Sequence, residues 1–242
     1  MSKIKEAFAD GRALIPFITC GDPSLEVTAE IIKKAKESGA DAAVLAIPFS
    51  DPTAEGAALQ AASLRALKGG VTTDTIFEML TKVRKTVKIP LVCMTYANVV
   101  FSYGIEKFLS LCRTAGIDGL MLRDVPVEER EEFAPLCAAY GVEFIIAAAP
   151  GKSERIQKIC AAAEGFLLLP GAEEAAIASL AEEVQKYTDV PVVVTYSGTE
   201  KVLPKAGNGV MVDTTVVEAV GTYGTDAPEK IAKLIAELKK AL

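Results

Sequence analysis

The stretch at residues 44–56, VLAIPFSDPTAEG, joins an apolar run to a sharp break and an acidic loop that contains a glycine. A carboxyl group in such a loop can transfer protons to and from a bound substrate. The chain contains no histidine, so catalysis must use carboxylates, Tyr, Lys, Cys or backbone dipoles. The acidic loop of this stretch is therefore a candidate site, whereas Val44, the first residue of the stretch, cannot transfer a proton.

The composition limits the partners and cofactors that we expect. The formal net charge is −6 and no run of Lys or Arg stands out, which argues against a nucleic-acid partner. We find no signal peptide or membrane span, so we expect a cytoplasmic protein with no membrane partner. The five cysteines form no CxxC pair, which indicates buried free thiols in a reducing compartment. We expect neither a metal nor a cofactor.

Eight short apolar runs alternate with helical patterns along the chain. Most of these runs are continuously apolar, as expected for parallel strands that are buried on both faces. The helical patterns include one that starts at a Ser24 cap and one that reads EEREEFAPLCAAYG. The order predicts a single (β/α)8 TIM barrel domain over 1–242; a doubly wound open sheet is the alternative, although no GxGxxG follows the first strand. The predicted strands cover 14–19, 42–47, 90–96, 119–124, 144–149, 165–170, 191–196 and 209–214.

In a (β/α)8 barrel, the chemistry lies at the carboxyl ends of the strands and in the loops that follow them. This rule directs attention to eight short segments, which all meet at one end of the barrel. They are residues 19–23, 47–56, 96–101, 123–129, 149–152, 170–174, 196–201 and 213–215.

Several motifs resemble one family. The segments IPFSDP, MTYAN and DVPVEE occur in this order on the second, third and fourth predicted strands, and together they resemble the tryptophan synthase α subunit. The resemblance is strong over about 1–165 and thin beyond. It implies a (β/α)8 barrel that cleaves indole-3-glycerol phosphate to indole and glyceraldehyde 3-phosphate in a retro-aldol step. It also implies a pyridoxal-phosphate-dependent β subunit as the partner that receives the indole.

The chain departs from this family where the reaction needs its chemical groups. Val44 stands where the family has its catalytic glutamate, and Glu55 stands where the family usually has a second acid, an aspartate. The family's phosphate loops are also altered, because LLLPGAEEAAIASL and TYSGTE replace its GVTG and GFGIS segments. Asp213 and Thr214 replace a Gly-Ser pair at the start of the last barrel helix. A carboxylate there would occupy the helix amides and repel a dianion, so we expect no phosphate binding at these positions.

Other family positions are retained. The resemblance places Phe17, Tyr96 and Asp124 in the substrate pocket, and it places Asp51, Pro52, Asn98 and Pro126 in loops near the β-type partner. Each has a simpler explanation as well, since Phe17 and Tyr96 can fill the barrel and the aspartates can cap turns.

Three functions follow from these observations. The one we favour at this point is an α-subunit-like protein that is impaired in, or lacks, indole-3-glycerol phosphate cleavage and keeps a β-type partner. The second is a functional α chain that uses Glu55 as its only acid. The third is a barrel repurposed for a non-phosphorylated ligand, for which the acids on one rim would be suited: Glu55, Asp124, Glu173, Glu200 and Asp213.

Overall fold

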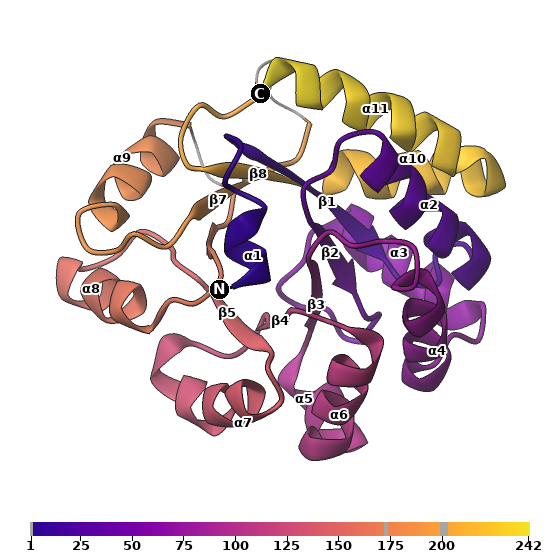
Figure 1. The fold of residues 1–242 in the computed structure, drawn as a ribbon, viewed down its shortest axis with the longest axis horizontal. Helices are drawn as coiled ribbons and strands as arrows, with labels where there is room; N and C mark the ends of the chain where they lie inside the picture. The colour runs from indigo at the N-terminus through magenta and orange to yellow at the C-terminus, as the bar shows by residue number, and fades with distance from the viewer. Residues whose placement is uncertain (1, 172–173, 199–202) are drawn as a thin grey trace.

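A closed barrel of parallel strands forms the centre of the molecule (Figure 1). The computed structural model describes residues 2–171, 174–198 and 203–242. Within these ranges the strands follow one another in sequence order, and the last pairs with the first, for example through Leu14 and Val210. This closure confirms the predicted TIM barrel and excludes the open-sheet alternative. The strands are β1 (Ala13–Thr19), β2 (Ala43–Ala46), β3 (Leu91–Thr95), β4 (Gly119–Leu122), β5 (Glu143–Ala147), β6 (Leu167–Leu169), β7 (Val192–Tyr196) and β8 (Gly209–Val212).

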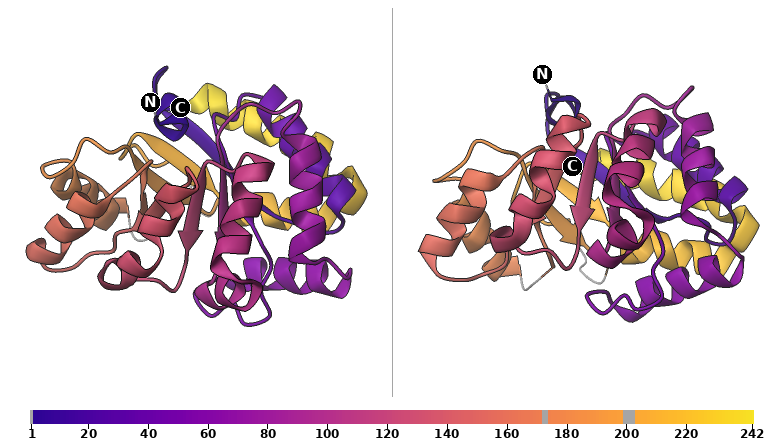
Figure 2. Two further views of the ribbon diagram at one scale, coloured as in Figure 1. Left: turned by 60° about the horizontal axis from the view of Figure 1, so that its bottom comes forward. Right: turned by 90° about the horizontal axis from the view of Figure 1, so that it is seen from below.

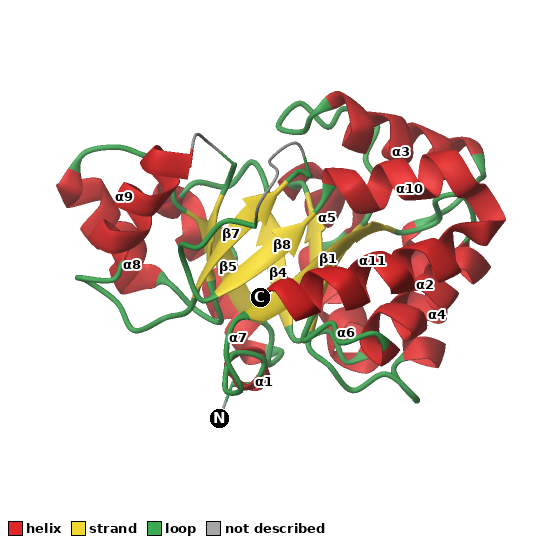
Figure 3. Cartoon of the chain, turned by 90° about the horizontal axis from the view of Figure 1, so that it is seen from above, coloured by secondary structure: helices red, strands yellow, loops and turns green. Residues whose placement is uncertain are grey.

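Helices surround the barrel, as Figure 3 shows, and in the described residues they lie between successive strands except between β7 and β8. This arrangement buries both faces of every strand, which explains their continuous apolar runs. In the described part of the chain the helices are α1 (Lys3–Glu6), α2 (Leu25–Glu37), α3 (Ala57–Lys68), α4 (Thr73–Val83), α5 (Ala97–Tyr103), α6 (Ile105–Ala115), α7 (Ala134–Ala139), α8 (Ser153–Ala162), α9 (Glu174–Val184), α10 (Thr214–Tyr223) and α11 (Ala227–Ala241), with two 3-10 segments, η1 (Val127–Glu132) and η2 (Gly224–Asp226).

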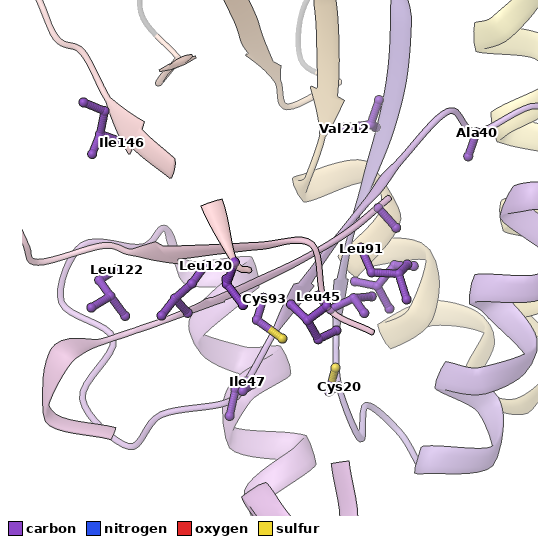
Figure 4. Close-up of a cluster of buried hydrophobic side chains, with 14 of the residues drawn as sticks. Cys20, Ala40, Leu45, Ile47, Leu91, Cys93, Leu120, Leu122, Ile146 and Val212 are labelled. Carbon is purple, nitrogen blue, oxygen red and sulfur yellow. The ribbon is translucent and has the colours of Figure 1, made fainter. Parts of the chain in front are cut away.

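The hydrophobic core has two layers because side chains alternate along each strand. One buried cluster includes Phe17, Val44 and Val92, which face the inside of the barrel. The next residues along the same strands, such as Leu45 and Cys93, belong to a second cluster between the strands and the helices (Figure 4). The barrel is therefore filled with side chains and has no open pore.

Helix α1 closes the amino-terminal end of the barrel. The Ile4 side chain is fully buried, and two glycines make room for it. A Cβ added to Gly119 would lie 2.9 Å from Ile4 Cδ1, and one added to Gly165 would lie 3.2 Å from the same atom. Phe8 also packs near Phe166, with ring centroids 6.4 Å apart. The site must therefore lie at the opposite end.

Some predicted elements differ in detail from the structure. Strand β4 ends at Leu122, so Arg123 and Asp124 lie in the following loop; β8 likewise ends at Val212, before Asp213. The pattern EEREEFAPLCAAYG forms the 3-10 segment η1 and a separate short helix α7, because Pro135 lacks the N–H that a continuous helix would need. Ser24 does cap α2 as predicted, with its side chain accepting from the Val27 N–H.

Two predictions from composition can also be compared with the structure. All five cysteines are free and buried, as the absence of CxxC pairs indicated. Among the described residues, no helix is long and apolar enough to cross a membrane.

Candidate functional site

The candidate site lies at the carboxyl ends of the strands. In Figure 2 the strand arrows point away from α1 and towards the opposite edge of the barrel. Glu55 follows β2, Tyr96 ends the β3 run, Arg123 follows β4 and Asp213 follows β8. These four side chains interact electrostatically across the barrel mouth, since Arg123, Asp213 and Tyr96 all act on the pKa of Glu55. Parallel strands therefore bring together residues that are far apart in the sequence.

Val44 lies inside the barrel beneath this mouth. Its backbone is in register with Phe17 of β1 and Val92 of β3, and its side chain is 0% exposed in the same inner cluster as both. The position that the resemblance assigned to a catalytic glutamate therefore holds an apolar side chain in an apolar layer. No proton transfer can occur at Val44, and of the two acids in this segment Asp51 is exposed, which leaves Glu55 as the half-buried carboxyl group.

The loop that carries Glu55 is held from both sides. The Ala54 N–H donates to Tyr96 Oη at 3.2 Å, and Arg123 Nη2 donates to the Ala54 carbonyl at 3.1 Å. The residues that directly follow β3 and β4 thus fix the peptide groups on both sides of Ala54, just before Glu55. On its other side, Gln60 Nε2 donates to the Glu55 carbonyl at 2.8 Å and ties the loop to α3.

Burial makes Glu55 a better proton carrier than an exposed glutamate. Its pKa is raised, mainly because burial disfavours the charged form, and the negative charge of Asp213 adds to this effect. The positive charge of Arg123 and a hydrogen bond from Tyr96 oppose the rise. A carboxyl group with a raised pKa holds its proton closer to neutral pH, which suits general acid–base catalysis.

Tyr96 occupies the centre of the cluster. Its ring packs against Phe49, with centroids 5.0 Å apart, and its hydroxyl group reaches the Ala54 N–H. Burial raises its pKa, and the nearby charge of Glu55 raises it further. The hydroxyl group therefore stays protonated at neutral pH and can donate a hydrogen bond.

Asp213 begins helix α10. Its carboxylate accepts a hydrogen bond from the Thr214 N–H, while Thr215 Oγ1 donates to the Ser197 carbonyl at 2.8 Å. The pKa of Asp213 is raised, chiefly because the group is buried. The acid thus occupies one amide at the helix start, where an anion would otherwise bind. The absence of a phosphate site at α10 stays a prediction.

The remaining predicted pocket residues are arranged differently. Phe17 is buried inside the barrel, 1% exposed, on the strand next to Val44. Asp124 is held by the backbone of α5, because its Oδ1 accepts from the Ala97 N–H at 2.8 Å, and its charge adds to the rise in the pKa of Tyr96. Asp124 therefore has the structural role of an exposed helix cap, and the structure gives it no contact with the Glu55 carboxylate.

The predicted partner-interface residues lie on loops and short helices around the same rim. Ser50 donates to the exposed Asp51 carboxylate at 2.6 Å, and Pro52 lines a groove of about 410 Å³ with Leu64 and Leu67 of α3. Leu64 is 53% exposed, which is unusual for a large apolar side chain. Two further predicted residues are close by in the chain: Asn98 on α5 and Pro126 before η1.

Arg123 is the functional candidate that the sequence analysis missed. It lies directly after a buried strand, at the carboxyl end of β4. This position could have identified Arg123 as a site residue from the sequence. Two acids of the proposed rim, Glu173 and Glu200, lie outside the described residues. In the part of the chain that the structure describes, no three His, Cys, Asp or Glu residues gather as metal ligands.

The sequence and the fold of this chain are similar to those of known proteins. A family model described as the tryptophan synthase alpha chain matches residues 4–242. The tryptophan synthase alpha chain of Lacticaseibacillus casei is 34% identical and aligns with 100% of this chain and 96% of its own. That of Methanosarcina barkeri is 38% identical over 99% of this chain and 97% of its own.

The solved structures agree with the sequence matches. A structure of the tryptophan synthase a2b2 complex from Pyrococcus furiosus superposes with a TM-score of 0.88 at 30% identity, covering 95% of this chain and 98% of that one. The family match extends past residue 165, where the sequence motifs are thin. The chain belongs to the tryptophan synthase alpha chain family.

Proposed function

We propose that this chain acts as a tryptophan synthase α chain that cleaves indole-3-glycerol phosphate, with Glu55 as its only proton-transferring carboxyl group. The observation that carries the proposal is the placement of Glu55 at the barrel mouth, half-buried and with a raised pKa. Membership of the family supports the substrate and the reaction type. The pseudoenzyme hypothesis favoured from the sequence receives no support from these relatives.

The retro-aldol step needs two proton movements. A proton is added to the indole ring carbon that carries the glycerol chain, and a proton is removed from the neighbouring hydroxyl group. The carbon–carbon bond between them then breaks, its electrons return to the ring, and an aldehyde is released. A single carboxyl group can serve both movements by giving one proton and accepting the other.

The neighbours of Glu55 suit this role. The clamp on Ala54 by Tyr96 and Arg123 fixes the loop, which keeps the carboxyl group in place during the reaction. The Tyr96 hydroxyl group can donate to the carboxylate when it is charged. Because Val44 supplies no second acid, we expect turnover slower than with two carboxyl groups by about 10²–10⁴-fold, the usual contribution of general acid–base catalysis.

Indole release from indole-3-glycerol phosphate tests the proposal, with the purified chain assayed alone and with a tryptophan synthase β subunit. Wild type should release indole slowly, Glu55→Gln should release none above background, and Glu55→Asp should retain part of the rate. Glu106→Gln on the exposed face of α6 is the matched control and should behave as wild type. Absence of turnover in wild type, or an unchanged rate in Glu55→Gln, would contradict the proposal.

A second candidate is a chain that binds a β-type partner but has little or no lyase activity. Two observations favour it: Val44 is fully buried, and Asp213 occupies the start of α10. The exposed side chains of Leu64 and Phe101, 53% and 49% exposed, lie near the retained Asp51, Pro52 and Asn98. Sedimentation with a β subunit distinguishes this candidate, which predicts a stable complex that releases no indole.

A further inference from the structure

A cavity of about 390 Å³ opens at the carboxyl ends of β4, β5 and β6, beside the Glu55 cluster. Two arginines line it: Arg123 comes from the end of β4, and Arg155 comes from the first turn of α8. Most of the remaining lining is apolar, including Met121, Leu122 and Pro170. A low-polarity wall strengthens the attraction of these two cations for an anion.

Arg123 has a buried donor without an acceptor. Its Nη2 donates to the Ala54 carbonyl, but its Nε is buried and has no hydrogen-bond partner. Two other arginines, Arg12 and Arg130, also bury an unpartnered Nε. The Arg12 guanidinium donates hydrogen bonds to backbone carbonyls, and the Arg130 guanidinium donates to the Glu131 and Glu164 carboxylates. Arg123 differs because its side chain lines a cavity that a ligand can enter.

Asp124 also lines this cavity, and the Asp124 and Glu128 carboxylates both have partners. The Asp124 carboxylate accepts a hydrogen bond from the Ala97 N–H. This contact at the start of α5 partly offsets its negative charge. Glu128 forms a paired contact with Arg155 at 3.0 and 3.2 Å, and the two side chains are 52% and 45% exposed. An ion pair this exposed is weak in water, so Arg155 can exchange Glu128 for a ligand at little cost.

The arginines and the acids Glu55 and Asp213 lie on different sides of the mouth. Glu55 and Asp213 lie on the side of β2 and β8, whereas Arg123 and Arg155, with the partnered acids Asp124 and Glu128, lie on the side of β4 and β5. An anionic group would be repelled by Asp213 at α10 and attracted to the arginines. A guanidinium offers donors in a planar fork that matches the oxygens of a phosphate group.

We propose that the cavity between Arg123 and Arg155 binds the phosphate-ester end of the ligand, in place of the start of α10. The identification of that ligand rests on the proposed function, but the site itself rests on the two arginines. A phosphate held there points the rest of the ligand across the mouth towards Glu55. Arg123 then joins the two parts of the site, because the same guanidinium holds the Glu55 loop and the anion.

Binding of three small probes tests this site without any need for turnover. The probes are glycerol 3-phosphate, glycerate and glycerol, titrated into the full chain and followed by protein NMR. Glycerol 3-phosphate should bind most tightly. Arg123→Met and Arg155→Met should each weaken it by about tenfold or more, the usual loss for a charge-assisted hydrogen bond. Arg113→Met on α6 is the matched control and should bind as wild type.

Arg155→Met leaves the Ala54 clamp intact, so it separates loss of the anion site from disturbance of the Glu55 loop. Thermal melting checks that each variant is folded. Equal binding of glycerol and glycerol 3-phosphate, tighter binding of glycerate, or binding unaffected by both arginine variants would overturn the inference. So would binding that Asp213→Gly strengthens and Arg155→Met leaves unchanged, since that places the phosphate at α10. Phosphate binding through the arginines without indole release would overturn the proposed function alone.

Discussion

A carboxyl group placed at position 44 tests how the barrel interior is sealed beneath the site. Val44 is 0% exposed and packs in the same apolar cluster as Phe17 and Val92. In Val44→Glu, burial would favour the neutral carboxyl form and raise its folded-state pKa. A rise of about 3 units, within the range for fully buried carboxyl groups, corresponds to about 4 kcal/mol of lost stability at pH values above the raised pKa.

The sign of this effect fixes its pH dependence. The folded-state pKa of the new carboxyl group is raised above its unfolded value. The penalty is therefore absent below the unfolded pKa, grows as the pH rises, and is complete above the folded pKa. Val44→Gln carries the same bulk and a buried polar group but no titration. Its loss relative to wild type, about 1–3 kcal/mol from overpacking, should not vary with pH because of residue 44.

Urea unfolding of both variants at several pH values between about 4 and 8 gives the measurement, using the free energy of unfolding of Val44→Glu minus that of Val44→Gln. This difference should become more negative as the pH rises, by up to about 4 kcal/mol. A difference that stays constant would mean that the carboxyl group reaches water or a cation, and would refute the sealed interior. If the carboxyl group also reaches the substrate, indole release should rise by about 10²–10⁴-fold over wild type.

Two further predictions concern the groups that hold the site loops. Arg65→Met should lower the free energy of unfolding by about 2 kcal/mol, less than for a fully buried pair. It leaves the Asp22 carboxylate, 2% exposed, without its bidentate partner, and Arg65 itself is 38% exposed. Urea unfolding measures this loss, and the double variant with Asp22→Asn should recover part of it; no recovery would contradict the pairing. Tyr96→Phe removes the acceptor of the Ala54 N–H, so it should cost about 1 kcal/mol in stability and reduce indole release more than that loss explains; an unchanged release rate would show that the clamp does not position Glu55.

The barrel was predictable because its strands are buried on both faces. Continuous apolar runs such as PLVCMTY are typical of such strands, and LVCMT indeed forms β3. The proximity of Glu55 and Asp213 could also be predicted from the sequence, since all parallel strands of a barrel end at one face. The resemblance placed Val44 correctly in the strand, and the structure shows why it is an ordinary core residue there.

Other features depend on side-chain contacts that no local pattern reveals. Asp124 could not be assigned in advance to the α5 N–H, because that contact joins residues on two successive loops. Arg123 looked like the end of a strand, and its importance arises only from its contact with Ala54 and from the cavity beside it. The break at Pro135 divides one predicted helix into η1 and α7, since the helix pattern and the proline rule conflict there.

The pH dependence of indole release tests the central claim most directly, with wild type and Glu55→Gln compared at saturating substrate and with a β subunit present. Glu55 must carry a proton to give it to the ring carbon, and its pKa is raised by burial. We predict that the wild-type rate falls as the pH is raised through a midpoint above the ordinary glutamate pKa of about 4.3. Glu55→Gln should show no such fall. A wild-type rate that is flat over this range, or the same fall in Glu55→Gln, would contradict the assignment of Glu55 as the proton-transferring group.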